Sequence, residues 1–166
     1  MDAHVRTRVS AYAIAVEDER LLLARLSDAS PVFAPGLWHM PGGGVDPGEQ
    51  PVEALSRELR EETGRELADA RLLDARTCTV RRNGVSWSLT ALFYAVALKD
   101  GASEVTEIDG STDAVMWIPL ADLQDDTMLS PAAADALRML EQRELWRDRL
   151  PNVRMTRGLV QHPGVA

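Results

Sequence analysis

The chain has 166 residues, enough for one compact domain, and its 45 % of hydrophobic and 27 % of charged residues are typical of a globular protein. Its formal net charge of −8 excludes a protein that wraps a nucleic acid polymer, because that task requires a basic surface. Its single cysteine, Cys78, excludes an intrachain disulfide, and the apolar run at residues 11–16 is too short to cross a membrane. We therefore expect one domain over residues 1–150, located in the reducing cytoplasm, and a tail over residues 151–166.

The first predicted elements are strands at residues 8–16 and 21–26, which a polar turn joins into a hairpin. Residues 27–36 predict a loop and residues 37–40 a short strand. Four glycines and two prolines follow within residues 41–48, so we expect a shaped loop without regular structure there.

The segment 51–63 gives the clearest helix prediction in the chain. It is rich in Glu, Arg, Leu and Ala, it starts with Pro51, and Gly64 follows it as a stop signal. At roughly 100° per residue, four positions form a stripe that we expect to face the core. These positions are Val52, Leu55, Leu59 and Thr63.

The rest of the chain predicts a second hairpin, a strand and a helix. Residues 70–82 and 85–98 flank Asn83-Gly84, a dipeptide that favours a tight hairpin turn. Residues 114–118 predict a strand, and residues 130–146 a helix that begins at a Ser-Pro pair. Hairpins combined with two helices indicate a mixed sheet between the helices, in a fold of the α/β or α+β class.

Three glutamates of the first helix fall side by side next to its apolar stripe. Glu61 and Glu62 follow Glu58 by three and four positions, so the charges of these glutamates repel each other unless a cation offsets them. Oxygen ligands of this kind suit Mg²⁺ or Mn²⁺. By itself such a run is most often a solvated helix face.

The glycine run just before the helix makes a ligand site the better interpretation. Glycines let backbone atoms approach a ligand where side chains would collide, and the N-terminus of a helix favours anions. The glycine run and the helix together predict a binding site for a metal ion and a diphosphate.

The spacing of these residues resembles the Nudix box, G-x5-E-x7-R-E-U-x-E-E-x-G-U, where U is aliphatic. Gly43, Glu49 and the run Arg57-Glu58-Leu59-Arg60-Glu61-Glu62-Thr63-Gly64 agree with it, and Arg65 departs from it at the last position. Flanking segments at residues 38–42 and 117–120 are also similar. The resemblance implies the α/β/α sandwich of that family around a mixed sheet.

The resemblance also implies roles for individual residues. Glu58, Glu61 and Glu62 match the family's metal ligands, with the backbone carbonyl of Gly42 beside them. Arg57 and Glu49 match a supporting ion pair, with Gly43 at the start of the motif. In the family, water attacks a phosphorus atom of a nucleoside diphosphate linked to another group, and either Glu61 or Glu62 could take the proton of that water.

A further acid could come from outside the motif. Glu104, Glu107, Asp109 and Asp113 lie in an acidic segment, and Asp113 is our candidate among them, although such segments are most often solvated. The tail over residues 151–166 could cover a second copy of the chain, so a homodimer stays open.

The substrate is the open question, because the motif concerns the diphosphate alone. The family's ADP-ribose hydrolases often carry a proline about fifteen residues past the motif, where this chain has Val80 and Arg81. Some of its dinucleoside-polyphosphate hydrolases carry a tyrosine slightly later, where this chain has Arg82 and Asn83. Both absences favour a nucleoside-triphosphate pyrophosphohydrolase over an ADP-ribose or nucleotide-sugar pyrophosphatase. A nucleotide sensor without catalysis is the alternative from another functional class.

Overall fold

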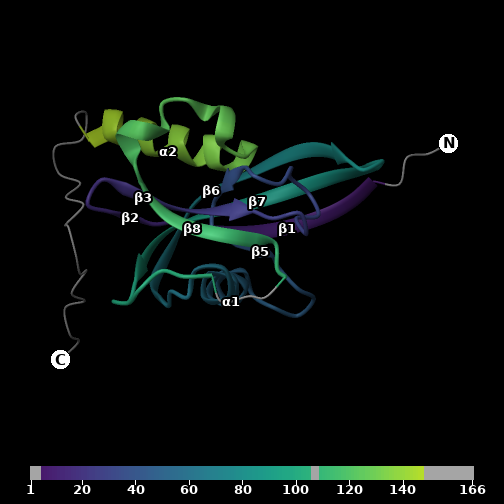
Figure 1. Ribbon diagram of the computed structural model, residues 1–166, viewed down its shortest axis with the longest axis horizontal. Coiled ribbons are helices and arrows are strands. Elements are labelled where there is room, and N and C mark those ends of the chain that lie inside the picture. Colours follow the sequence, from purple (N-terminus) through teal and green to yellow (C-terminus); the bar gives the residue numbers. More distant parts are fainter. Residues whose placement is uncertain (1–4, 106–108, 148–166) are drawn as a thin grey trace. The chain divides into compact units, whose positions relative to one another are not determined.

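Two β-sheets form the framework of the computed structural model, which describes residues 5–105 and 109–147 (Figure 1). The chain divides into two units, Met1–Ala136 and Leu137–Ala166, and both sheets belong to the first. The predicted tail over residues 151–166, with the homodimer contact considered for it, lies outside the described residues.

The first sheet is mixed, because β1 and β7 run parallel and its other pairs are antiparallel. Its order is β5 (Gly42–Gly44), β1 (Val5–Ile14), β7 (Val85–Leu98) and β6 (Leu67–Arg82). The second sheet is antiparallel throughout. Its order is β2 (Val16–Glu17), β3 (Arg20–Leu26) and β4 (Trp38–His39), and β8 (Thr112–Pro119) also pairs with β3.

Helix α1 (Pro51–Thr63) and the start of α2 (Pro131–Arg147), both within the first unit, contact opposite faces of the mixed sheet. On one face, Leu55 and Leu59 of α1 pack against Ala11 and Ala13 of β1. Side chains alternate along a strand, so Ser10 and Tyr12 point to the other face. There Ala132 and Asp135, at the start of α2, line a cavity with them. The predicted α/β class with a mixed sheet is confirmed. Two short 3-10 helices, η1 (Leu120–Leu123) and η2 (Asp126–Met128), precede α2.

The strand predicted at residues 8–16 is in fact two strands in different sheets. β1 ends at Ile14, and β2 begins at Val16 and forms the hairpin with β3. Asp18 and Glu19 make its turn with φ values of 47° and 61°. The sequence does not mark the break, because the apolar run of residues 11–16 continues across it.

The later elements agree with the predictions. β6 and β7 form the expected hairpin, and Asn83 and Gly84 turn it with φ values of 51° and 76°. β8 and α2 also form where expected; β8 is longer than predicted by two residues at its start and one at its end, and α2 is displaced by one residue. No helix in the described ranges is both long and apolar enough to cross a membrane.

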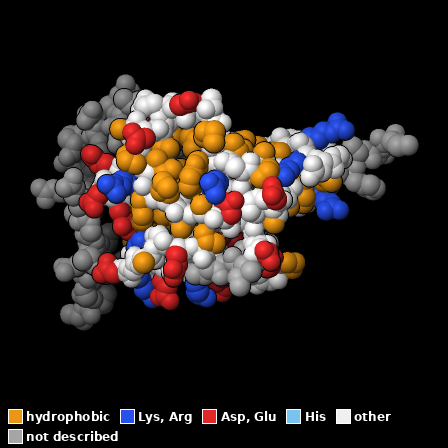
Figure 2. Space-filling model, viewed as in Figure 1, with side chains coloured by type: hydrophobic (Ala, Val, Ile, Leu, Met, Phe, Trp, Pro, Cys, Tyr) orange, Lys and Arg blue, Asp and Glu red, His pale blue; other side chains and the backbone are white. Residues whose placement is uncertain are grey.

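One face of the molecule carries hydrophobic side chains over β8, whose Met116 is 53 % exposed, and charged side chains surround them at several edges, one of them along α1 (Figures 1 and 2).

Candidate active site

Helix α1 begins and ends where the sequence predicts. The Glu53 carboxylate accepts the Gln50 N–H at 2.9 Å just before the helix, and Pro51 occupies its first position. Gly64 ends it in a left-handed conformation, with φ 68°, and its N–H bonds the carbonyl of Arg60. The glutamates of the motif thus lie in the last two turns of a well-defined helix.

The buried side of α1 is rotated toward the glutamates relative to the prediction. Val52 is 41 % exposed, so its predicted place in the core is wrong, whereas Leu55, Leu59 and Thr63 are buried as expected. Glu62 is also buried, with 2 % exposure. The packing of α1 against β1 and β5 sets this rotation, and helical periodicity alone cannot locate it.

The three glutamates form a gradient of burial. The Glu61 side chain is 40 % exposed, the Glu58 side chain is 14 % exposed, and Glu62 is out of contact with water. Burial raises the pKa of Glu58, although the adjacent Arg57 opposes this effect. One end of the cluster is therefore open to a ligand, and the other belongs to the core.

Glu62 is held by donors from distant parts of the chain. Its Oε2 accepts the Gly42 N–H at 2.9 Å, and its Oε1 accepts the hydroxyls of Thr112 at 3.1 Å and Ser111 at 3.3 Å. Burial nevertheless raises the pKa of Glu62 to about 8, and the charge of Glu58 contributes to this rise. No local sequence pattern marks Ser111 and Thr112 as partners of Glu62, because they follow it by 49 and 50 residues.

Arg57 joins the loop before the helix to the glutamates. Its Nε and Nη2 donate to the two carboxylate oxygens of Glu49, each at 2.9 Å, and its Nη1 donates to Glu58 at 2.8 Å. The Arg57 guanidinium lowers the pKa of Glu49, and these partners raise the pKa of Arg57. Nη2 also reaches the carbonyl of Gly44 at 3.1 Å, and Nη1 lies 3.5 Å from Glu61.

Within the predicted loop at residues 41–48, Gly42–Gly44 form a short edge strand, β5, whereas residues 45–48 contain no helix or strand, as predicted. Gly42 pairs with Tyr12 of β1 at φ 134°, and a Cβ there would lie 2.1 Å from the Ala11 carbonyl oxygen. A Cβ on Gly43 would lie 2.6 Å from the Glu58 carboxyl carbon. Glycine is thus what allows β5 to lie against both β1 and the carboxylates.

The donor chemistry of this cluster fits a hard divalent cation. All its side-chain donors are carboxylate oxygens. Burial is the main cause of the raised pKa of Glu58 and of Glu62, the charge of Glu61 adds to the first rise and the charge of Glu58 to the second, so a positive charge among them would be stabilising. Within the described ranges, no three His, Cys, Asp or Glu side chains are grouped closely enough to surround an ion. Glu58 and Glu61 are turned toward Arg57, so binding requires them to rotate.

Asp113 lies apart from the glutamates. Its Oδ1 accepts the Arg25 Nε at 2.7 Å on the surface, whereas the preceding residue, Thr112, points to Glu62. The pairing of β3 with β8 skips Asp113, since Arg25 faces Ala114 and Leu26 faces Thr112. This bulge turns the Asp113 side chain outward. Of the other acidic candidates, Glu107 lies outside the described residues.

Arg65, the departure from the family motif, is a buried part of the core with 5 % exposure. Its Nη2 donates to the Lys99 carbonyl at 2.9 Å and its Nη1 to the Ser103 hydroxyl at 3.2 Å. Its guanidinium lies 5.7 Å from the centre of the Trp117 ring. It therefore joins the end of α1 to β8, a task that an aliphatic side chain performs by packing alone.

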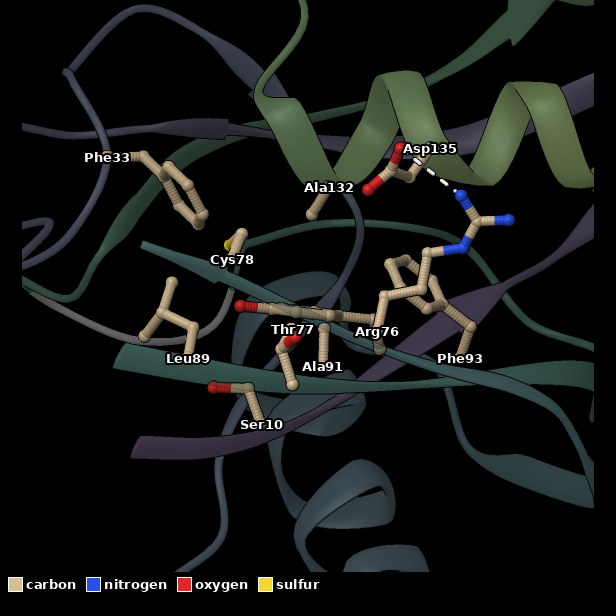
Figure 3. A pocket seen from close by; sticks show the side chains of 11 residues that line it. Ser10, Phe33, Arg76, Thr77, Cys78, Leu89, Ala91, Phe93, Ala132 and Asp135 are labelled. Atoms are coloured by element: carbon tan, nitrogen blue, oxygen red, sulfur yellow. Dashed lines mark ion pairs between the residues drawn. The ribbon is translucent and has the colours of Figure 1, made fainter. Parts of the chain in front are cut away.

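A small cavity lies on the opposite face of the mixed sheet, between β6, β7 and the start of α2 (Figure 3). Arg76 and Asp135 form an ion pair across its rim at 3.7 Å. Its volume of about 10 Å³ has room for about one water molecule. A nucleobase does not fit there unless the surrounding side chains move.

Solved structures resemble this fold over most of its length. The MutT NUDIX hydrolase from Burkholderia pseudomallei is 32 % identical, with a TM-score of 0.66 over 81 % of this chain and 98 % of that chain. The NUDIX domain of Shewanella oneidensis NrtR, solved with ADP ribose, is 22 % identical, with a TM-score of 0.64 over 85 % of this chain and 89 % of that chain. Because the identity to NrtR is only 22 %, this second similarity shows a shared fold and nothing more.

Among curated relatives, the nucleoside triphosphatase NudI of Escherichia coli O1:K1 is 44 % identical over 63 residues, which are 38 % of this chain and 44 % of NudI. The match thus spans less than half of that relative. The family model for the NUDIX domain matches residues 6–142, which include both sheets and all of α1. The chain therefore belongs to the Nudix hydrolase family.

Proposed function

We propose that this protein hydrolyses a diphosphate bond in a nucleoside diphosphate derivative with the help of Mg²⁺, for which Mn²⁺ can substitute. The observation that carries the proposal is the place of Glu58, Glu61 and Glu62 at the end of α1, beside the glycine strand β5. With the Gly42 carbonyl, these carboxylates would hold the cation. The single cysteine suits the reducing cytoplasm as the site of action.

Each residue has a distinct part in this proposal. The bound cation offsets negative charge on phosphate oxygens and lowers the pKa of water. The Arg57–Glu49 pair keeps Glu58 and Glu61 beside β5, since Arg57 contacts all three carboxylates. Either Glu61 or Glu62 takes the proton from the attacking water, and Glu61 is the more exposed of the two.

We infer that the substrate is a nucleoside triphosphate, deoxy or ribo, cut to a monophosphate and pyrophosphate. The segment shared with NudI, a nucleoside triphosphatase, supports this choice. The ADP-ribose complex of NrtR belongs to a protein similar in fold alone. Residues 80–83, where other subfamilies carry a proline or a tyrosine, lie around the tip of the β6–β7 hairpin.

The test is hydrolysis by the purified protein with Mg²⁺ of a panel of substrates. The panel contains dNTPs, oxidised dNTPs, ADP-ribose, NADH, dinucleoside polyphosphates and nucleotide sugars. We expect pyrophosphate release from at least one triphosphate. If ADP-ribose or a nucleotide sugar is cleaved faster than every triphosphate, that compound replaces the nucleoside triphosphate as the proposed substrate. If no compound is cleaved, the alternative of a nucleotide sensor without catalysis is favoured.

Substitution of the glutamates tests the metal assignment. We expect Glu61→Gln and Glu62→Gln to lower kcat by at least about a hundredfold, because each loses a charged oxygen for the cation or the water proton. Circular dichroism should show an unchanged fold in both variants. Full activity in both would contradict the assignment.

A further inference from the structure

Arg8 lies on the face of β1 that points away from helix α1. Ala11 and Ala13 of the same strand pack against α1, and strand alternation places Arg8, Ser10 and Tyr12 on the opposite face. The Arg8 side chain is half-buried there, and its Nε donates to the Ser10 hydroxyl at 3.3 Å.

The Arg8 guanidinium extends over the glycine strand β5. A Cβ on Gly44 would lie 2.8 Å from Arg8 Nη2 and 3.0 Å from its Cζ, so a side chain at residue 44 would displace the guanidinium. The carbonyl of Gly44 accepts Nη2 of Arg57 at 3.1 Å. Two arginines thus meet β5 at the same glycine.

Their charges are balanced very differently. Arg57 has Glu49 within 2.9 Å and Glu58 within 2.8 Å. For Arg8, the described part of the chain supplies the bond to Ser10 and no carboxylate within 4.0 Å. A guanidinium has five N–H donors, and among the described residues only the Nε donor of Arg8 has an acceptor, which leaves four without one. Partial burial of this charge without an anion is unfavourable.

Arg8 is nevertheless close to the candidate active site. Burial is the largest influence on the pKa values of Glu58 and His39, and the positive charge of Arg8 opposes the rise at Glu58 on one side of β5 and adds to the fall at His39 on the other. An anion that spans β5 from the glutamates would therefore come within its reach. The planar guanidinium pairs with phosphate through two parallel N–H bonds.

We propose that Arg8 binds a phosphate group of the substrate beside β5, on the side opposite the metal-binding glutamates. This inference rests on the proposed function, because it assigns the second half of the same diphosphate site. The cation would neutralise one phosphate, and Arg8 would neutralise its neighbour. Nothing in the family motif marks this residue, which precedes the motif by more than thirty positions.

The test compares Arg8→Gln and Arg8→Lys with a matched control, Arg6→Gln. Arg6 lies two residues earlier on the same strand, is exposed, and stacks at 5.7 Å from the centre of the Trp87 ring. We expect Arg8→Gln to raise KM for the best substrate by roughly ten- to a hundredfold, with kcat changed much less. This change corresponds to the usual free energy of a hydrogen bond to a charged group. Arg8→Lys should recover part of the loss, and Arg6→Gln should behave like the wild type.

Calorimetric binding of inorganic pyrophosphate in the absence of metal separates this inference from the proposed function. Weaker pyrophosphate binding by Arg8→Gln would support the role of Arg8 even if the wild type hydrolysed nothing in the panel. Equal pyrophosphate affinity and equal KM in wild type and Arg8→Gln would overturn it. A lower melting temperature for Arg8→Gln with unchanged KM would assign Arg8 to the fold alone.

Discussion

The Arg57 side chain shows at the scale of one residue how the candidate site is held together. Its Nε and Nη2 donate hydrogen bonds to the two carboxylate oxygens of Glu49, and its Nη1 donates to Glu58. The first contact fixes the loop before α1 to the helix. The second competes with a cation for the Glu58 carboxylate. Arg57 therefore both organises the cluster and balances its charge when no metal is bound.

The change Arg57→Lys keeps this charge and removes the fork. We expect a loss of about 1–2 kcal/mol in the free energy of unfolding and roughly tenfold lower kcat, because lysine cannot bond both Glu49 oxygens while reaching Glu58. Urea unfolding and steady-state kinetics measure the two effects. Arg60→Lys, an exposed arginine on the same helix, is the control. Wild-type values in Arg57→Lys would show that charge alone suffices.

His39 is a buried neutral group on the other side of β5. The rings of Tyr12 and Phe33 lie 4.8 Å and 5.0 Å from its ring, and its Nδ1 lies 2.6 Å from the Ser130 hydroxyl. Burial lowers the pKa of His39 from 6.5 to about 3. Between these values the unfolded chain binds a proton on His39 and the folded chain does not.

His39 should therefore make the protein sensitive to acid. Its contribution to stability is complete above about pH 6.5 and is lost as the pH falls toward 3, at up to about 1.4 kcal/mol per pH unit. We expect His39→Gln, which can still bond Ser130, to flatten this part of the curve of unfolding free energy against pH. If the unfolding free energy of wild type and of His39→Gln falls equally steeply as the pH is lowered, this would contradict the burial of an uncharged His39.

At the scale of elements, β5 depends on glycine more than any other strand. Gly42→Ala would place a methyl group against the Ala11 carbonyl at a φ of 134°. We expect a loss of about 3 kcal/mol or more in unfolding free energy, since β1 lies in the core and cannot withdraw.

Gly48→Ala is the matched control for this prediction. Gly48 also has a positive φ, 85°, but no atom lies within 4 Å of its added Cβ. We expect Gly48→Ala to lower the free energy of unfolding by about 1–2 kcal/mol, from backbone strain alone. Chemical denaturation of both variants measures the difference, and equal losses would show that strain, and not the contact with β1, requires glycine at residue 42.

The elements that the sequence predicted correctly are those with local signals at their ends. Helix α1 has Pro51 at its start and Gly64 at its stop, and the β6–β7 hairpin has Asn83-Gly84 at its turn. The break between β1 and β2 has no such signal, because partners far along the chain decide which sheet each segment joins. For the same reason β5 resembles a loop in sequence, since β1 makes it a strand.

The candidate site was predictable to a similar degree. The family motif identifies Glu58, Glu61 and Glu62, and the ion pair of Arg57 with Glu49 forms as expected. The burial of Glu62 and the outward turn of Asp113 depend on β8, whose register carries a bulge. These features come from tertiary contacts that no local pattern encodes.

For the whole molecule, the net charge of −8 and the paired carboxylates predict that a divalent cation stabilises the folded state. We expect Mg²⁺ to raise the melting temperature, and a concentration of 100 times Kd adds about 2.7 kcal/mol. Glu58→Gln and Glu62→Gln should reduce this shift. Differential scanning calorimetry at constant ionic strength, with KCl as the control salt, measures it. The same shift in wild type and variants would place the cation elsewhere.

The contacts of Glu62 also have a consequence for how the protein folds. The family motif is continuous in sequence, but Thr112 bonds Glu62 from 50 residues away, and β5 requires pairing with β1 at the start of the chain. Long-range contacts of this kind form late and make folding slow. A peptide that carried the whole motif would hold every residue named by the family pattern and yet lack the environment that buries Glu62. Recognition of the motif is local, whereas its chemistry belongs to the complete fold.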